Sequence, residues 1–132
     1  MNTSDRGCYT EAVIVAALLK RGYEVFKPIA AHSRCDLVVV IKGEFKRFQC
    51  KTARLQDGVV EFNAYSQCGS LRGKARRHYR ESADYFLAFC EENDSIYIVP
   101  VAVAPTCECK LRVDPPKNNQ MKGVIWAKDF LI

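Results

Sequence analysis

Four polar side chains in the first half of the sequence are of the types that bind a metal ion and act on a phosphate. Asp36 directly precedes the apolar run 37–41, and Gln49 and Lys51 lie two residues apart in the next extended segment. Glu11 lies upstream in a stretch with helical spacing. Carboxylate and amide oxygens suit the octahedral shell of Mg²⁺. A lysine beside such a metal orients or activates water and stabilises charge on a phosphate, so the pattern predicts metal-dependent chemistry on a phosphate ester.

A hairpin would position three of these side chains. The apolar run Leu37 to Ile41 is rich in valine, which predicts a central strand covered on both faces. Lys42-Gly43-Glu44 signals a tight turn, so residues 45–52 should return antiparallel, with Asp36 opposite positions 49 to 51. Because side chains alternate along a strand, three polar residues of the returning strand share one face: Arg47, Gln49 and Lys51.

A helix over residues 5–21 would bring the fourth side chain, Glu11, to the sheet. Asp5 or Ser4 can cap this helix, and Gly22 can end it. Glu11 falls inside the apolar stripe, where a carboxylate is costly unless a positive charge or a metal meets it. We expect that stripe to consist of Cys8, Ala12, Val15, Leu18 and Leu19.

Each candidate also has a purely structural interpretation. Aspartate often caps a turn before a strand, which would explain Asp36. Gln49 and Lys51 could form an ordinary polar strand face. Glu11 could pair with a basic side chain such as Lys51, although such a pair adds buried charge without a purpose. The combination of all four residues, in this order along a basic chain, favours a catalytic site.

Length and composition favour one globular domain, residues 1–132, of the α/β (α+β) class. Hydrophobic residues make up 48% and charged residues 27% of the chain, which excludes a disordered protein. The apolar runs are far shorter than the roughly 18 residues of a membrane span. Because no basic segment leads into an apolar stretch at the N-terminus, we expect no secretory signal and a cytoplasmic, intracellular location.

The seven cysteines are an odd number, and in an intracellular protein they predict free thiols rather than a disulfide framework. Cys107 and Cys109 form the only close pair in the sequence. No second pair or nearby histidine completes the four ligands of a zinc site.

Positive charge is concentrated between residues 71 and 80, in a chain of net charge +5. A basic cluster beside glycines predicts contacts to DNA phosphates from a loop or helix, and a solvated helix face is the alternative. A later polar loop has the side chains that suit adenine edges in the major groove, although an ordinary loop has the same composition. The predicted DNA-binding residues are Arg72, Lys74, Arg76, Arg77, Arg80, Asn118, Asn119 and Gln120.

At the four candidate residues the sequence resembles the PD-(D/E)xK nuclease superfamily. In that pattern an acidic residue opens one core strand, (D/E)-x-K lies on the next strand, and a helical glutamate lies upstream. The counterparts here are Asp36, Gln49 with Lys51, and Glu11. Cys35 replaces the proline that precedes the aspartate. Gln49 replaces the acidic residue, which removes one negative charge from the metal site and makes Glu11 the expected second carboxylate.

More specifically, the chain is similar to the small group of these endonucleases that includes intron-encoded homing enzymes of cyanobacterial tRNA introns. The resemblance implies a restriction-endonuclease-like mixed β-sheet core flanked by helices. It also implies Mg²⁺-dependent hydrolysis of double-stranded DNA to 5′-phosphate and 3′-hydroxyl ends by a homo-oligomer, with Mn²⁺ as a substitute metal. The similarity rests on short segments: Arg47 to Ala53, Ala83 to Phe86, Ile96 to Pro100, Leu111 to Val113, Lys117 to Gln120 and Ile125 to Ala127.

The resemblance implies a role for each of the four residues. Glu11 and Asp36 would ligate Mg²⁺ directly or through water, and Gln49 would add a neutral ligand or hold a water. Lys51 would position the attacking hydroxide and offset phosphate charge. One domain of 15.0 kDa carries one such site, so cutting both strands calls for at least two subunits, in a dimer or a tetramer.

Three other functions remain open from the sequence. One is a structure-selective nuclease of the archaeal Holliday-junction resolvase type, which would use the same four residues. Another is a DNA-binding module that has lost catalysis, with Gln49 as the trace of that loss. The last is a structural subunit whose cysteine-rich surface is an interface.

Overall fold

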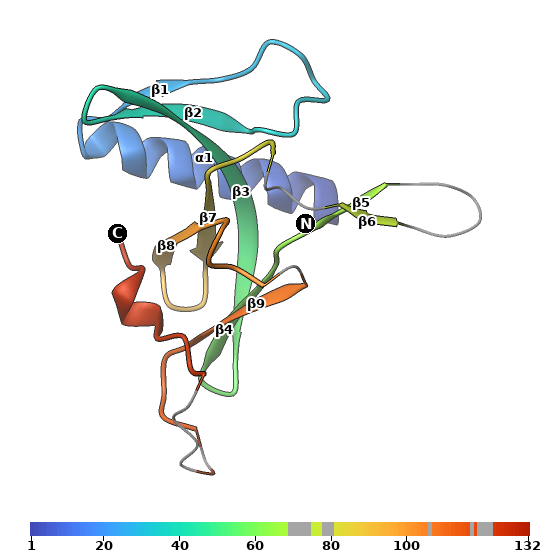
Figure 1. Ribbon diagram of the computed structural model, residues 1–132, viewed down its shortest axis with the longest axis vertical. Helices are drawn as coiled ribbons and strands as arrows, with labels where there is room; N and C mark the ends of the chain where they lie inside the picture. The colour runs from blue at the N-terminus through green and yellow to red at the C-terminus, as the bar shows by residue number, and fades with distance from the viewer. Residues whose placement is uncertain (69–74, 78–80, 106, 117, 119–122) are drawn as a thin grey trace.

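A mixed β-sheet with one long helix on one face forms the body of the protein (Figure 1). The computed structural model describes residues 1–68, 75–77, 81–105, 107–116, 118 and 123–132. The helix is α1 (Thr3–Lys20) and the sheet has seven strands. They are β1 (Glu24–Phe26), β2 (Leu37–Ile41), β3 (Glu44–Gln56), β4 (Val59–Asn63), β7 (Tyr85–Cys90), β8 (Ser95–Pro100) and β9 (Glu108–Arg112). This confirms the α+β class and the mixed sheet, with a single α-helix in the described part of the chain.

Strand β3 organises the sheet because it pairs with three other strands. Its first part pairs antiparallel with β2, its middle part pairs parallel with β7, and its last residues pair antiparallel with β4. Strand β8 then pairs with β7, and β9 pairs with β4. The long curved path of β3 therefore connects the two halves of the sheet, as Figure 1 shows.

The β2–β3 hairpin has the tight turn that the sequence predicts. The two turn residues, Lys42 and Gly43, have φ values of 51° and 80°. Two-residue hairpin turns with positive φ at both positions match the twist of the flanking strands, and glycine adopts this conformation without steric cost. The turn sets a register in which Leu37 lies opposite Phe48.

Helix α1 begins earlier than the sequence pattern predicts, and Ser4 and Asp5 are not its cap. The cap is Asn2, whose Oδ1 accepts a hydrogen bond from the Asp5 N–H at 2.8 Å. The helix ends at Lys20, and Gly22 follows with φ of 84°. No helix in the described part of the chain is long and apolar enough to cross a membrane.

The buried face of α1 also differs from the predicted apolar stripe. Its buried residues are Thr10, Ile14 and Leu18. Cys8, Ala12 and Leu19, which we expected to be covered, are exposed. The predicted stripe is wrong because the helix turns a different side to the sheet, the side that carries Thr10 and Ile14. The Thr10 hydroxyl is satisfied there by Thr52 Oγ1 at 2.7 Å.

Two hydrophobic clusters lie on the two sides of the sheet. The cluster under α1 includes Ile14, Leu37, Val39 and Phe48. The second cluster lies around β4, β7, β8 and β9 and contains no residue of β2. The prediction that both faces of residues 37–41 are covered is therefore wrong. Leu37 and Val39 are fully buried, while the alternate valines of β2 are only half-buried.

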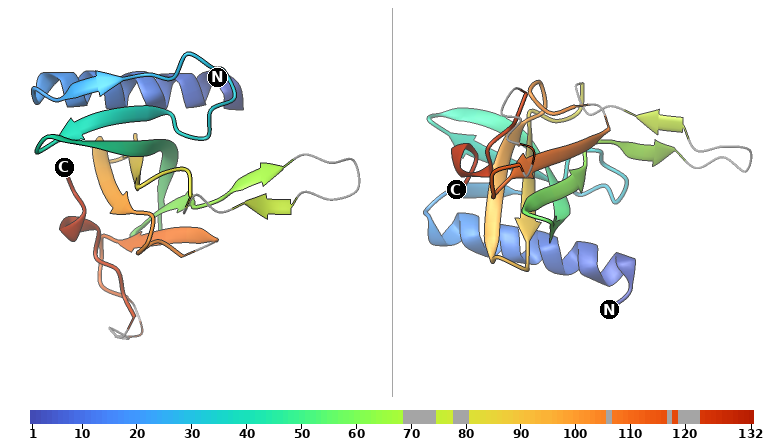
Figure 2. Two further views of the ribbon diagram at one scale, coloured as in Figure 1. Left: turned by 45° about the horizontal axis from the view of Figure 1, so that its top comes forward. Right: turned by 90° about the horizontal axis from the view of Figure 1, so that it is seen from below.

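A small antiparallel ribbon of β5 (Ser66–Cys68) and β6 (Ala75–Arg77) projects from the body of the protein (Figure 2). The prediction of a basic helical stretch is wrong for residues 75–77, because their backbone pairs with 66–68 in extended conformation. The ribbon follows β4 directly and returns the chain to the start of β7. After β9 the chain ends with a short 3₁₀ helix, η1 (Ala127–Asp129).

Candidate active site

Asp36 is held at the open end of the β2–β3 hairpin, as the sequence predicts. Its backbone N–H donates to the Phe48 carbonyl oxygen at 2.9 Å. Its carboxylate oxygen Oδ2 accepts a hydrogen bond from the Cys50 N–H, also at 2.9 Å. Since Cys50 lies between Gln49 and Lys51, these two bonds tie the carboxylate to the strand segment that carries the other two candidate residues.

The environment of Asp36 disfavours its negative charge. Burial is the main reason why the pKa of Asp36 is raised above its ordinary value, and the nearby Glu11 carboxylate raises it further. The Cys50 N–H and the positive charges of Lys51 and Lys27 act in the opposite direction without cancelling the shift. Two carboxylates in a partly dehydrated place are the arrangement that a divalent cation relieves.

Lys51 is a largely buried lysine in the middle of β3. Its Nζ donates a hydrogen bond to the Tyr65 carbonyl oxygen at 3.1 Å and lies 5.9 Å from the centroid of the Phe86 ring. Burial lowers its pKa to about 8, Arg34 lowers it as well, and Asp36 opposes the shift. The ammonium group is therefore poorly hydrated and close to a carboxylate, which suits a role in stabilising charge on a phosphate.

Gln49 provides the clearest sign that the site accommodates another group. Its Oε1 is buried and accepts no hydrogen bond from the part of the chain that the structure describes. A buried amide oxygen without a donor costs free energy, and a metal ion or its water would satisfy it. Within the described residues, no three acidic, histidine or cysteine side chains form a metal-binding group. A metal held here would use the Gln49 oxygen together with the Asp36 and Glu11 carboxylates.

Glu11 lies on α1 and makes a salt bridge that the sequence analysis did not identify. Its Oε1 is 2.7 Å from the Nζ of Lys27, not from Lys51 as the structural alternative supposed. The Glu11 side chain is 26% exposed, so it is half-buried rather than part of the core. The signal that could have found Lys27 is the short strand before it, because β1 packs beside α1.

The charged state of Lys51 should affect the stability of the metal-free protein. Because the folded state lowers the Lys51 pKa from 10.5 to about 8, it binds the proton less well than the unfolded state does. The free energy of unfolding should therefore rise with pH between those two values. In EDTA at neutral pH, we expect Lys51→Met to be more stable than the wild type by about 1 to 2 kcal/mol.

Chemical denaturation of both proteins at several pH values would test this expectation. The stability difference should shrink from about pH 8 upward and vanish near 10.5. All other ionisable groups are the same in both proteins, so the difference isolates Lys51. A constant difference across the range would show that Lys51 is an ordinary exposed cation.

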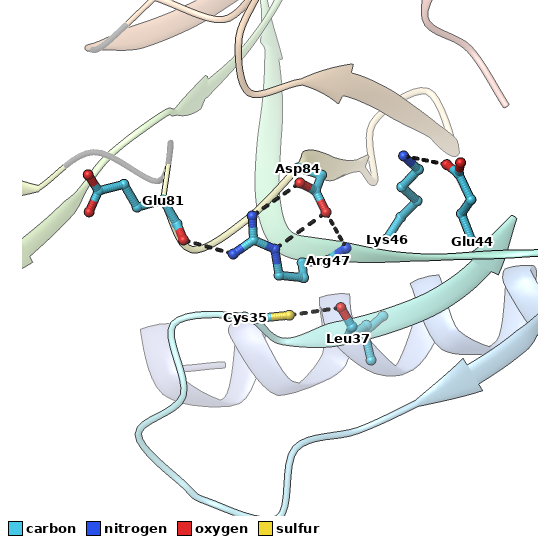
Figure 3. A network of polar contacts seen from close by, with 7 residues as sticks. All are labelled: Cys35, Leu37, Glu44, Lys46, Arg47, Glu81 and Asp84. Atoms are coloured by element: carbon cyan, nitrogen blue, oxygen red, sulfur yellow. Dashed lines mark hydrogen bonds and ion pairs between the residues drawn. The ribbon is translucent and has the colours of Figure 1, made fainter.

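An ion-pair network fixes the start of the parallel β3–β7 pair, just before the site residues (Figure 3). Asp84 Oδ2 accepts from the Arg47 backbone N–H at 2.8 Å, and Asp84 Oδ1 lies 3.1 Å from Arg47 Nη2. Arg47 Nη1 donates to the Glu81 carbonyl oxygen at 2.7 Å, and the Asp84 N–H donates to the Arg47 carbonyl oxygen at 2.8 Å. The sequence places Arg47 on the face of Gln49 and Lys51, but its role here is to hold two strands in register.

Replacing Asp84 with alanine should lower the free energy of unfolding by about 1 kcal/mol near neutral pH, because the charged bonds are partly exposed. The hydrogen bond from Arg47 is the main cause that lowers the Asp84 pKa. The stabilisation is therefore present above the ordinary aspartate pKa and is lost as the pH falls through the lowered folded value. Equal stability losses at pH 7 and pH 2 would contradict this account. Glu44→Ala is the matched control, since the exposed Glu44–Lys46 pair should contribute nothing measurable.

Three of the eight predicted DNA-binding residues lie in the part of the chain that the structure describes. Arg76 and Arg77 lie in strand β6 of the projecting ribbon. Asn118 is exposed. The remaining residues lie outside the described part of the chain: Arg72, Lys74, Arg80, Asn119 and Gln120.

The fold matches a solved structure of an endonuclease. The structure of a bacterial homing endonuclease, I-Ssp6803I, superimposes with a TM-score of 0.78, and the match covers 99% of this chain and 89% of that chain. The two sequences are 21% identical, so the match shows a shared fold. No significant match was found among curated protein sequences.

A match over the whole sequence identifies the family of this chain. The family model described as PD-(D/E)XK endonuclease matches residues 1–132. This match agrees with the hairpin geometry of Asp36, Gln49 and Lys51 and with the shared fold. The chain belongs to the PD-(D/E)XK endonuclease family and is an endonuclease, a hydrolase that acts on DNA.

Proposed function

We propose that the protein is a Mg²⁺-dependent endonuclease that cuts double-stranded DNA at specific sites, as homing enzymes do, and leaves 5′-phosphate and 3′-hydroxyl ends. Enzymes of this family generally use divalent metal ions. The observation that carries the proposal is that Asp36 is bonded to β3 at Cys50, between Lys51, whose ammonium is largely buried, and Gln49, whose buried Oε1 accepts no hydrogen bond from the described residues. We further propose that residues 1–132 form one nuclease domain.

In this proposal each residue of the site has one task. Asp36 and Glu11 would hold Mg²⁺ directly or through water, and Gln49 Oε1 would add a neutral ligand or hold a water. Bound Mg²⁺ supplies Lewis-acid stabilisation of the charge on the scissile phosphate. Lys51 would orient the attacking water and offset negative charge as the phosphate reacts. The Asp36–Cys50 hydrogen bond keeps the carboxylate beside both β3 residues throughout.

The position where the β5–β6 ribbon begins supports a role for the ribbon in binding DNA. Tyr65 directly precedes β5, and its carbonyl oxygen accepts the hydrogen bond from Lys51. Strand β5 therefore begins one residue after a contact with the candidate site. We propose that five basic residues contact DNA phosphates: Arg72, Lys74, Arg76, Arg77 and Arg80. We also propose that Asn118, Asn119 and Gln120 contact bases.

Cleavage of both strands requires more than one copy of this chain. One chain carries one set of the four site residues. The two strands of a duplex run in opposite directions, so a symmetric pair of subunits would present one site to each strand. We propose a homo-oligomer, either a dimer or a tetramer.

Cleavage assays on defined DNA would test this function. The substrates are linear duplexes, including tRNA-gene sequences, and a four-way junction, each with Mg²⁺, with Mn²⁺ or with EDTA. We expect double-strand breaks at one duplex site with either metal and none with EDTA. Symmetric nicking of the junction alone would make the protein a resolvase, and tight binding without cutting would make it an inactive DNA-binding module.

A further inference from the structure

A second lysine, Lys27, lies at the solvent side of the candidate site. It directly follows β1, and its Nζ is 2.7 Å from Glu11 Oε1. The Lys27 side chain is 61% exposed, whereas Lys51 is largely buried and bonded to Tyr65. The two ammonium groups therefore have different environments. The Lys51 ammonium is largely buried and hydrogen-bonded, whereas the Lys27 ammonium lies at the end of a flexible side chain in solvent.

The ammonium group of Lys27 acts on both carboxylates of the candidate site. The carboxylates of Glu11 and Asp36 are close enough to repel each other, and the positive charge of Lys27 acts on both of them. The Cys50 thiol also acts on Lys27, and Lys51 and Cys35 interact with Asp36. Without Lys27, the repulsion between these two carboxylates would be offset by less positive charge.

We propose that Lys27 is a positioning residue that holds Glu11 in place in the metal-free enzyme and gives it up to the metal, so that Lys27 competes with the metal for Glu11. This inference rests on the proposed function. The Lys27 ammonium takes up part of the lone-pair capacity of the Glu11 carboxylate and partly neutralises it, and a cation bound there would repel Lys27. An exposed ion pair is weak enough to be displaced by a divalent ion that gains several oxygen ligands.

A titration of the DNA-free protein with Mn²⁺ would test the competition. Binding is measured as the loss of the free-ion signal in electron paramagnetic resonance. Lys27→Met should bind Mn²⁺ about threefold to fivefold more tightly than the wild type, which corresponds to the strength of one exposed ion pair. Lys27→Arg keeps the charge and should bind Mn²⁺ as the wild type does. Lys20→Met is the matched control, because it removes one exposed positive charge that has no contact with Glu11.

Thermal unfolding provides a second readout that a purely structural ion pair would not produce. In EDTA, Lys27→Met should unfold at a lower temperature than the wild type, because the two carboxylates lose their counter-ion. With saturating Mn²⁺ the two proteins should unfold at the same temperature, since the metal replaces Lys27. An equal loss with and without Mn²⁺, together with an unchanged Mn²⁺ affinity, would overturn the proposal.

Glu11→Gln in the same titration separates this inference from the proposed function. If the wild type and Glu11→Gln bind Mn²⁺ equally, Glu11 is not a metal ligand, and both the site assignment and the role of Lys27 fail. If Glu11→Gln weakens binding and Lys27→Met has no effect, the metal site stands and the competition by Lys27 is refuted. The proposal requires opposite effects from these two substitutions.

Discussion

Replacing Lys51 with methionine should slow DNA cleavage by about a thousandfold or more, while the affinity for DNA stays nearly unchanged. Methionine fills a similar volume beside Phe86 but has no ammonium group to orient water or offset phosphate charge. DNA affinity comes from many phosphate contacts, so the loss of one buried charge has a small effect on it. The measurements are single-turnover cleavage in Mg²⁺ and DNA binding in Ca²⁺.

Lys46→Met is the matched control for this substitution. Lys46 lies on the same strand, β3, and pairs with the exposed Glu44 at 2.9 Å. Its removal takes away the same charge without touching the site, so the cleavage rate should stay at the wild-type value. Cleavage by Lys51→Met at the wild-type rate would mean that Lys51 is a structural lysine and that the site has been misassigned.

Asp36→Asn should slow DNA cleavage by about a thousandfold, as Lys51→Met does. It should also weaken Mn²⁺ binding by at least about tenfold. The asparagine oxygen can still accept the hydrogen bond from the Cys50 N–H, so the hairpin should keep its geometry. The substitution also removes a carboxylate that is buried and repelled by Glu11. The variant should therefore be at least as stable as the wild type in EDTA, and only its activity and metal binding should be lost.

Asp84→Asn is the control that separates charge at the site from charge elsewhere. The same change at Asp84 weakens the Arg47 network and should lower stability, with no effect on Mn²⁺ affinity. If Asp36→Asn instead lowered stability and left Mn²⁺ affinity unchanged, Asp36 would be a turn-capping residue, which is its structural interpretation.

The geometry of the hairpin could be predicted from the sequence because local rules determine it. A two-residue turn with glycine sets the register, and strand alternation then sets which side chains share a face. Both rules hold for Asp36 opposite the Gln49 to Lys51 segment. The sequence also predicts strands over residues 59–63, 85–90 and 95–99, where strand-forming residues lie between turn signals, and β4, β7 and β8 occupy these segments.

Features that depend on contacts between distant segments could not be predicted. The partner of Glu11 is Lys27, which directly follows β1 and has no sequence pattern in common with Glu11. The buried face of α1 includes Thr10 because Thr52, on β3, satisfies its hydroxyl group. Residues 75–77 form a strand because residues 66–68 pair with them, although their local composition suits a helix.

The most direct test of the central claim is the position of Mn²⁺ in a crystal of the protein with bound DNA, located by anomalous scattering. The account predicts a peak within ligand distance of Asp36 and Gln49 Oε1, with Glu11 bound directly or through water and Lys27 moved off the Glu11 carboxylate. A fully occupied Mn²⁺ peak elsewhere, with no metal or metal-bound water at Gln49 Oε1 and Asp36, would contradict the account.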